Sequence, residues 1–230
     1  TCALPIYTHV TFEMDSPDGD QGYPGALVMK VTYSLDEENT LMIHYEAEPD
    51  QDTIINMTNH SYFNLNGHKS GDVLNHTLWL NADAFTPADA ASIPTGEIRS
   101  VEGTPMDFRT DKTIGKDIGA DYEPLVFGNG YDHNWVLKNE GEFDKVAEVA
   151  GDESGIHMSV LTDLPGVQIY TANFLDGVKG RDGAVYEMRD AICLETQYYP
   201  DAIHHENFPG PICKKGEKYD IRTAYRFSVK

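Results

Sequence analysis

The stretch Ile221-Arg222-Thr223-Ala224-Tyr225-Arg226-Phe227-Ser228-Val229, near the C-terminus, decides the fold class. Its large apolar and aromatic residues alternate with arginine, alanine and serine. Successive side chains of a β-strand point to opposite faces, so the pattern predicts a strand with one buried and one charged face. An amphipathic helix would instead repeat its apolar positions about every three to four residues.

Two segments near the start of the chain show the same alternation. Residues 27–33 and 41–47 carry apolar side chains at every second position. The tetrapeptide Asp36-Glu37-Glu38-Asn39 lies between them and is typical of a turn. The two segments therefore predict an antiparallel hairpin.

Short strands with frequent turns are predicted for most of the chain. Its 20 glycines and 12 prolines recur at short intervals and include several turn-forming pairs such as Asn66-Gly67. Residues 83–128 carry few strand signals and predict a long excursion with short turns, a kind of loop that often shapes sites. The absence of repeats and obvious linkers predicts one all-β domain, an antiparallel β-sandwich or barrel.

The composition limits the possible partners. The chain has 230 residues and a formal charge of −21, with 38 acidic and 17 basic residues. Such a surface repels nucleic acids and anionic lipids, so a neutral small molecule is the expected partner. No apolar run approaches the length of a membrane span. The cysteines Cys2, Cys193 and Cys213 match neither a disulfide framework nor a zinc pattern, which favours a reducing, cytoplasmic location.

The first candidate for chemistry is His60, within Thr58-Asn59-His60-Ser61-Tyr62-Phe63-Asn64-Leu65. In an extended segment, His60 and Tyr62 share one face and can line a cleft. A histidine there can transfer protons to a sugar-sized ligand. The alternative is a structural histidine satisfied by hydrogen bonds.

The second candidate is Glu195, in Asp190-Ala191-Ile192-Cys193-Leu194-Glu195-Thr196-Gln197. In a strand, Cys193, Glu195 and Gln197 share one face. A carboxylate is costly to bury in such a mostly uncharged strand unless a partner uses it. The alternative is a salt bridge, for example to Arg189 or Arg222.

Two further polar residues could hold sugar hydroxyl groups. Asp132 lies among aromatic residues in Gly130-Tyr131-Asp132-His133-Asn134-Trp135, although this segment could equally be a turn that leads Trp135 into the core. Gln168 lies between Val167 and Ile169 and could bind a diol or face water. The triplet His204-His205-Glu206 is a weak metal candidate, because adjacent strand residues point in opposite directions.

Together, these segments resemble the aldose 1-epimerase (galactose mutarotase) family. The resemblance runs from about Val10 to the C-terminus and rests on several motifs in the family's order. These are Asn59–Leu65, Tyr131–Asn134, Gly166–Leu175, Leu194–Gln197, Pro200–Ala202 and Tyr225–Phe227. The resemblance implies a large antiparallel β-sandwich and an isomerase that interconverts the α and β anomers of free aldoses such as galactose and glucose.

The resemblance also implies the site. By motif match, His60 is the proton donor and Glu195 the general base, Asp132 and Gln168 hold sugar hydroxyls, and Ser61 and Tyr62 border the site. An ordinary glutamate, with a pKa of about 4.3, is ionised at neutral pH, and an ordinary histidine, at about 6.5, can hold or release a proton. This reaction needs no metal, nucleotide or redox cofactor.

The chain departs from the family pattern at its start. An N-terminal portion with an Asn-Arg pair and a second active-site histidine cannot be placed, so residues 10–230 are expected to be the C-terminal part of the family domain. Residues 1–9 are expected to be a non-native or disordered start, with Thr1–Ile6 an assembly artefact. A chain without part of its sugar clamp is expected to be a poor catalyst.

Two other functions stay open at this point. One is a carbohydrate-binding β-sandwich without catalysis. The other is a related hexose-6-phosphate 1-epimerase, for which a cluster of arginines around the ligand is expected. The preferred aldose and the oligomeric state are not predicted by the sequence.

Overall fold

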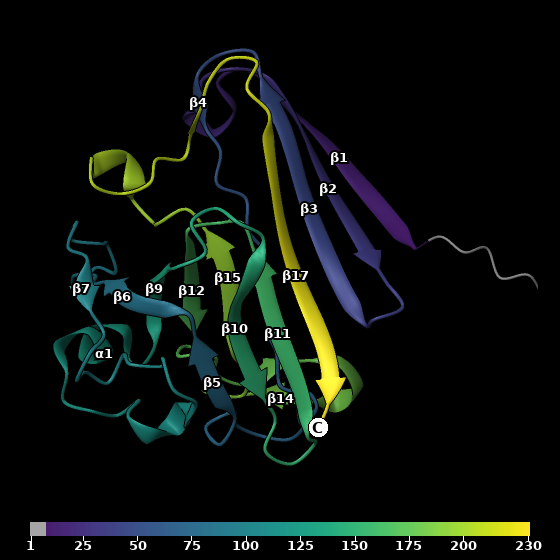
Figure 1. Ribbon diagram of the computed structural model, residues 1–230. Coiled ribbons are helices and arrows are strands. Elements are labelled where there is room, and N and C mark those ends of the chain that lie inside the picture. The colour runs from purple at the N-terminus through teal and green to yellow at the C-terminus, as the bar shows by residue number, and fades with distance from the viewer. Residues whose placement is uncertain (1–7) are drawn as a thin grey trace, which may run out of the picture.

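The computed structural model describes residues 8–230, which are built mainly of antiparallel strands (Figure 1). The larger sheet has eight strands, in the order β1 (His9–Ser16), β2 (Leu27–Leu35), β3 (Thr40–Pro49), β17 (Tyr219–Val229), β11 (Ile156–Thr162), β10 (Asp144–Ala150), β5 (Thr77–Leu80) and β8 (Lys112–Thr113). The smaller sheet has five strands, in the order β15 (Cys193–Gln197), β12 (Gly166–Tyr170), β9 (Asp132–Leu137), β6 (Ala82–Thr86) and β7 (Arg99–Ser100).

The remaining elements are short. Two ribbons pair β13 (Val178–Lys179) with β14 (Val185–Tyr186) and β16 (Ile212–Cys213) with β4 (Thr53–Ile54). Within residues 8–230, α1 (Glu123–Gly128) is the only α-helix. No helix of these residues is long and apolar enough to span a bilayer. The 3-10 turns are η1 (Asp20–Gly22), η2 (Ile114–Lys116), η3 (Arg181–Gly183) and η4 (Ala202–His204).

The strand predicted near the C-terminus is confirmed as β17, which lies between β3 and β11. Its Arg222 and Arg226 side chains are exposed, and Tyr225 is fully buried, as the alternation predicts. Ala224 differs, because it is buried on the face predicted to be exposed. The larger residues Met42 and Leu161 lie directly opposite Ala224 on the neighbouring strands and can shield so small a side chain.

The predicted hairpin is also confirmed. β2 and β3 are joined by the predicted turn, and Val31 pairs with Tyr45 across them. The Asp36 carboxylate accepts hydrogen bonds of 2.9 Å from the backbone nitrogens of Glu38 and Thr40. Asn39 then takes a left-handed conformation with φ of 58°, which asparagine tolerates better than most residues.

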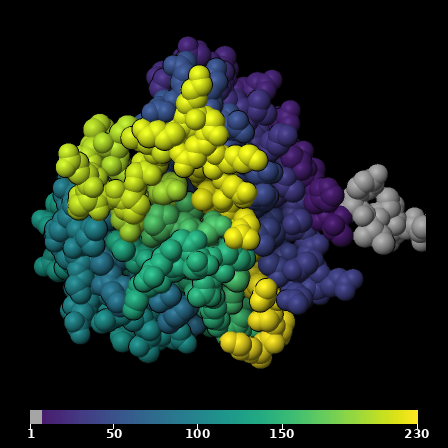
Figure 2. Space-filling model, turned by 45° about the horizontal axis from the view of Figure 1, so that its top comes forward, coloured from purple at the N-terminus to yellow at the C-terminus, as the bar shows by residue number. Residues whose placement is uncertain are grey.

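The two sheets pack against one shared core. The hydroxyl group of Tyr225 in the larger sheet donates to the Leu194 carbonyl in the smaller sheet at 2.9 Å. The buried side chains of the core come from both sheets and include Ile43, Tyr45, Leu78, Val160, Phe85, Trp135, Ile169 and Leu194. The predicted antiparallel all-β fold is therefore confirmed, and the C-terminal residues lie beside the N-terminal strands in the space-filling view (Figure 2).

The excursion predicted over residues 83–128 is largely irregular, but it also contains most of β6. The burial of β6 does not alternate regularly, because a bulge shifts its pairing with β9 between Ala82 and Ala84. That irregularity hid the strand from a period-two pattern. The predicted artefact at Thr1–Ile6 lies outside the described residues.

Candidate active site

Most of the predicted site residues line one cavity of about 390 Å³, which is lined by residues of β9, β12 and β15 in the smaller sheet. Its lining combines carboxylate, amide, imidazole and aromatic side chains: His60, Tyr62, Asp132, Gln168, Tyr170, Phe174, Glu195, Gln197 and Pro200. A neighbouring cavity of about 710 Å³ is larger, but its lining is mostly apolar and lacks the His60 and Glu195 pair. The smaller cavity is therefore the one that contains the predicted acid and base.

Three adjacent strands bring the polar residues of the cavity together. Gln168 on β12 lies opposite Glu195 on β15, and Tyr170 on β12 lies opposite Asp132 on β9. Directly paired residues project from the same face of a sheet, so all four side chains reach the same side. Gln168 also donates a hydrogen bond of 2.8 Å to Asp132 Oδ1, which fixes the amide and the carboxylate relative to each other.

His60 comes from residues 55–62, which form no regular strand. Two contacts hold this segment against the edge of β15. The Asn56 amide exchanges hydrogen bonds of 2.9 and 3.0 Å with the Tyr198 backbone, and the Phe63 backbone exchanges two of 2.9 Å with Ile192. His60 therefore lies next to Glu195, in a segment whose two ends are fixed by these hydrogen bonds.

The alternation expected within this segment holds locally. Asn59 points into the protein, where its amide contacts the hydroxyl groups of Tyr45 at 3.4 Å and Tyr225 at 3.0 Å. His60 and Tyr62 lie on the other side, with ring centroids 5.0 Å apart and planes inclined by 27°. The core-facing asparagine thus orients the neighbouring histidine toward the cavity.

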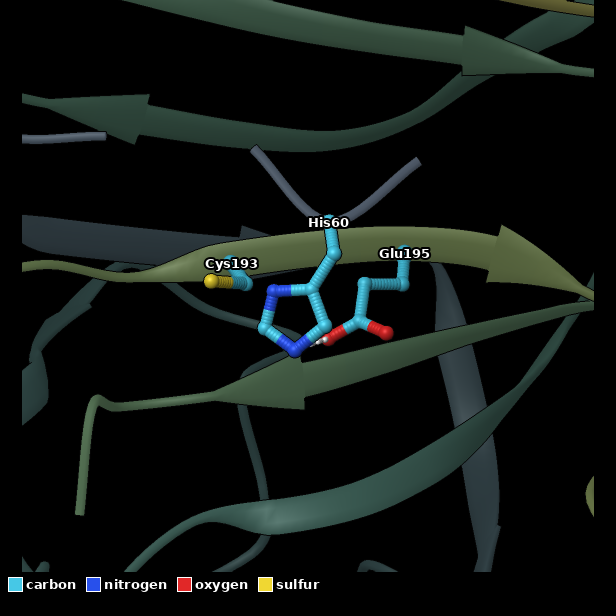
Figure 3. A group of neighbouring side chains, drawn as sticks. All are labelled: His60, Cys193 and Glu195. Atoms are coloured by element: carbon cyan, nitrogen blue, oxygen red, sulfur yellow. Dashed lines mark ion pairs between the residues drawn. The ribbon is translucent and has the colours of Figure 1, made fainter. Parts of the chain in front are cut away.

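His60 Nε2 lies 3.4 Å from Glu195 Oε1 (Figure 3). The side chain of His60 is 51% exposed and that of Glu195 is 11% exposed, so the pair joins an accessible ring to a buried carboxylate. Cys193 lies on the same strand, and one donor atom from each of the three residues lies within 4.8 Å of the others. Within residues 8–230, these three residues are the group whose donor atoms could hold a metal ion, with His60 and Glu195 lining the cavity and Cys193 buried beside them.

The alternative salt bridges of Glu195 are wrong. Arg189 instead donates to Thr171 and to the side chain of Asn173, and Arg222 pairs with Asp163 at 3.1 Å. Within residues 8–230, the recorded ionic partner of Glu195 is His60 alone. The carboxylate is therefore not neutralised by a fixed positive charge.

Burial raises the pKa of Glu195 from its ordinary value to about 7. The neighbouring His60 lowers this pKa, whereas the Asp132 carboxylate raises it further. Burial also raises the pKa of Asp132, and the hydrogen bond from Gln168 opposes this shift. Glu195 is therefore poised to gain or lose a proton near neutral pH, which the ordinary value for glutamate does not predict.

The structure separates Ser61 from the other predicted residues. Ser61 is exposed and does not line the cavity, unlike its neighbours His60 and Tyr62. Gln197 and Tyr170 also line the cavity, although neither was among the predicted site residues. A period-two signal was present for both, since they lie two residues from Glu195 and Gln168.

Phe174 and Pro200 had no such signal. Both lie outside the long strands and reach the cavity through the path of their loops. Conversely, no residue of the excursion 83–128 lines this cavity, so the expectation that the loop shapes the site is wrong for the described cavity.

The weak metal candidate His204-His205-Glu206 has a structural explanation. His204 Nδ1 and His205 Nε2 both contact the carboxylate of Asp201. The His205 ring also packs on Phe208, with centroids 4.9 Å apart. Both rings are thus engaged in local contacts rather than gathered around an open position.

An all-β fold with a histidine and a carboxylate side by side in a cavity lined by polar and aromatic side chains is suited to proton transfer on a small ligand rich in hydroxyl groups. The chain belongs to the aldose 1-epimerase family, whose sequence model matches residues 3–226.

Individual relatives agree with this assignment. The chain is 46% identical over 221 residues to galactose mutarotase from Bos taurus and 45% identical to that from Homo sapiens. It is 39% identical to aldose 1-epimerase from Escherichia coli (strain K12). These alignments cover 96%, 96% and 95% of this chain, but each covers 63% of the relative.

Solved structures of the family share the fold. The GalM/aldose epimerase homologue from C. elegans superposes with a TM-score of 0.86 at 32% identity, covering 96% of this chain and 66% of that one. Galactose 1-epimerase from Lactobacillus acidophilus gives 0.83 at 30% identity, covering 96% and 63%.

Proposed function

We propose that this chain binds a free aldose in the cavity around His60 and Glu195 and interconverts its α and β anomers. The observation that carries the proposal is the 3.4 Å contact between His60 Nε2 and Glu195 Oε1 in a solvent-open cavity. Mutarotation needs a base at the anomeric hydroxyl and an acid at the ring oxygen. These two atoms of a pyranose share one carbon, so an acid and a base side by side can reach both.

Each residue has one part in the reaction. Glu195 removes the proton from the anomeric hydroxyl, and His60 donates a proton to the ring oxygen as the bond from that oxygen to the anomeric carbon breaks. The open-chain aldehyde then rotates about the bond between its first two carbons. The ring closes on the other face of the carbonyl while Glu195 returns a proton and His60 accepts one.

The raised pKa of Glu195 suits this reversible exchange. Proton transfer is most efficient when the pKa of the catalytic group lies near the working pH, and that of Glu195 is about 7. Burial of the carboxylate keeps its charge costly, so the protonated form left after the first step is also stable.

The other lining residues are proposed to hold the sugar. Asp132 and Gln168 are fixed by their mutual hydrogen bond and can accept from and donate to vicinal hydroxyls. Tyr62 and Tyr170 present aromatic rings around His60, with the Tyr170 centroid 5.8 Å from the imidazole. Ser61 does not line the cavity, and we propose no sugar contact for it beyond its position next to His60.

Polarimetry of freshly dissolved α-galactose tests the proposed function. The chain is expected to accelerate the decay of optical rotation above the spontaneous rate, in proportion to protein concentration. His60→Ala is the matched control and should lose the acceleration, because it lacks the proposed proton donor. Its half-exposed ring can be removed with little loss of packing. A rate equal to that of the buffer, for chain that retains its folded circular dichroism spectrum, would contradict the proposal.

The rate is expected to depend on pH through Glu195. The base must be ionised, so kcat/KM should fall as the pH decreases through about 7, the raised pKa of this carboxyl. Polarimetry in several buffers, with the spontaneous rate subtracted, measures this profile. A rate that stays constant between about pH 5 and about pH 8 would assign the base to another group.

Gln168→Leu is expected to weaken sugar binding more than it changes the fold. The variant removes the amide that contacts Asp132 and substrate, at a cost of about 1–3 kcal/mol for a lost polar contact to a charged group. Isothermal titration with galactose measures the affinity. Gln51→Leu, an exposed glutamine outside the cavity, is the control, and an unchanged affinity in Gln168→Leu would exclude Gln168 as a ligand.

A carbohydrate-binding protein without catalysis is the second candidate. The Asp132 to Gln168 hydrogen bond and the aromatic lining would serve binding alone equally well. A hexose 6-phosphate is less well supported as the ligand, because no lysine or arginine of residues 8–230 lines the cavity. Inorganic phosphate as a competitor of galactose binding checks this point.

We further propose that residues 10–230 form a single domain in a reducing, cytoplasmic environment. One core cluster extends from Leu27 to Tyr225 and draws on both sheets, which supports a single domain. Cys193 and Cys213 are buried free thiols, as expected of a protein kept reduced.

A further inference from the structure

Cys193 has no part in the proposed reaction, yet its thiol lies beside the two groups that do. Cys193 and Glu195 are two residues apart on β15 and therefore project from the same face. The imidazole of His60 lies over that face, with the thiol on one side of the ring and the carboxylate on the other in Figure 3. Imidazole nitrogen, thiol sulfur and carboxylate oxygen are the three donor types that bind zinc in proteins.

We propose that His60, Cys193 and Glu195 form a binding site for a thiophilic divalent cation such as Zn²⁺. A cation at this site occupies the acid and the base together, so its bound form cannot interconvert anomers. The inhibitory consequence rests on the proposed function, whereas the binding itself does not.

The distances suit a site that closes on the metal. One donor atom from each residue lies within 4.8 Å of the other two. With zinc bonds of about 2.0–2.3 Å in tetrahedral geometry, ligand atoms lie roughly 3.3–3.7 Å apart. The donors therefore need to approach one another by up to about 1.5 Å.

The His60 ring can supply that movement. It is half exposed and, in the described part of the chain, it makes no recorded hydrogen bond beyond its contact with Glu195. Rotation of the Glu195 side chain adds to this movement, because turning the ring alone leaves the distance between the thiol and the carboxylate unchanged. The cavity of about 390 Å³ leaves room for a water molecule as the fourth ligand and for entry of the ion.

The local charge also favours a cation. The carboxylates of Glu195 and Asp132 both face the cavity, and no lysine or arginine of the described residues lines it. The chain as a whole carries a formal charge of −21, which raises the local concentration of cations. Binding forms a metal–thiolate bond and releases the thiol proton to solvent, with no change in oxidation state.

Cobalt provides a direct test of the thiolate ligand. The chelator-treated 230-residue chain, titrated with Co²⁺ alone, is expected to develop a near-ultraviolet thiolate-to-cobalt charge-transfer band that Zn²⁺ then abolishes. The Cys2→Ser/Cys213→Ser double variant keeps Cys193 as its single thiol and should retain the band. Cys193→Ser should lose it and bind Zn²⁺ at least about tenfold more weakly in isothermal titration.

His60→Ala is a second ligand variant, which keeps the test valid if Cys193→Ser fails to fold. Its ring is half exposed, so the variant should stay folded and still bind Zn²⁺ at least about tenfold more weakly. Absence of the band in the unsubstituted chain, or its persistence in Cys193→Ser, would overturn the proposed site. The cobalt titration contains no sugar and therefore tests the metal site alone. If the chain binds Co²⁺ but its metal-free form does not accelerate mutarotation, the proposed function is contradicted and the metal site stands.

Discussion

Glu195→Gln is expected to reduce the rate of mutarotation by about 10²–10⁴-fold, the typical contribution of one general acid or base. Glutamine keeps the size of glutamate and can still contact His60, but its amide cannot accept the proton of the anomeric hydroxyl. Galactose affinity should change little, because Asp132, Gln168 and the aromatic rings remain. Polarimetry gives the rate, and isothermal titration gives the affinity.

Glu206→Gln is the matched control, since Glu206 is an exposed glutamate outside the cavity. It should leave both quantities unchanged. An equal rate for Glu195→Gln and the unsubstituted chain would favour a binding protein without catalysis, or a base other than Glu195.

The same variant should change how stability depends on pH. The pKa of Glu195 is raised to about 7 by burial, so the folded state holds this proton more tightly than the unfolded state. The contribution of Glu195 to the free energy of unfolding is fully present below its unfolded pKa of about 4.5. This contribution is lost as the pH rises to the folded pKa of about 7. Glu195→Gln lacks this decline and should gain up to about 3 kcal/mol over the native chain between these limits, measured by urea denaturation.

Trp135→Ala is expected to destabilise the fold by about 3–5 kcal/mol, as for other large aromatic residues removed from a packed core. Trp135 is fully buried and packs against Phe85, Phe108 and Tyr131. Its indole nitrogen also donates to the Met106 carbonyl at 3.1 Å, so truncation leaves that buried acceptor unpaired.

Trp79→Ala separates burial from hydrogen bonding. The Trp79 indole makes the same kind of bond, to the Arg109 carbonyl at 3.1 Å, but its side chain is only half-buried. Urea denaturation followed by circular dichroism should show a loss for Trp79→Ala well below that for Trp135→Ala. Equal losses would show that the hydrogen bond, rather than core packing, dominates at both positions.

Period-two alternation predicted some of the strands and of their shared faces. It predicted β17, the β2 and β3 hairpin, and the shared face of Cys193, Glu195 and Gln197. It failed at β6, where a bulge interrupts the period. The burial of Ala224 was also not predictable, because it depends on cross-strand neighbours far away in the sequence.

The candidate site shows the same division. The sequence indicated the chemical groups, because a histidine among hydrogen-bonding residues and a carboxylate in a mostly uncharged strand stand out from their surroundings. It did not predict that Arg189 and Arg222 are engaged elsewhere, nor that the pKa of Glu195 lies near 7. Both depend on side chains brought together by the fold rather than on local spacing.

The alternation of β15 restricts which length changes the gene can tolerate. Leu194 and Thr196 face the core, while Cys193, Glu195 and Gln197 share the opposite face, from which Glu195 and Gln197 line the cavity. A single inserted or deleted codon within β15 would exchange the two faces downstream of it and drive a carboxylate into the core. Variation in this segment should therefore be confined to substitutions, whereas the exposed turn at Asp18–Gly22 can change in length.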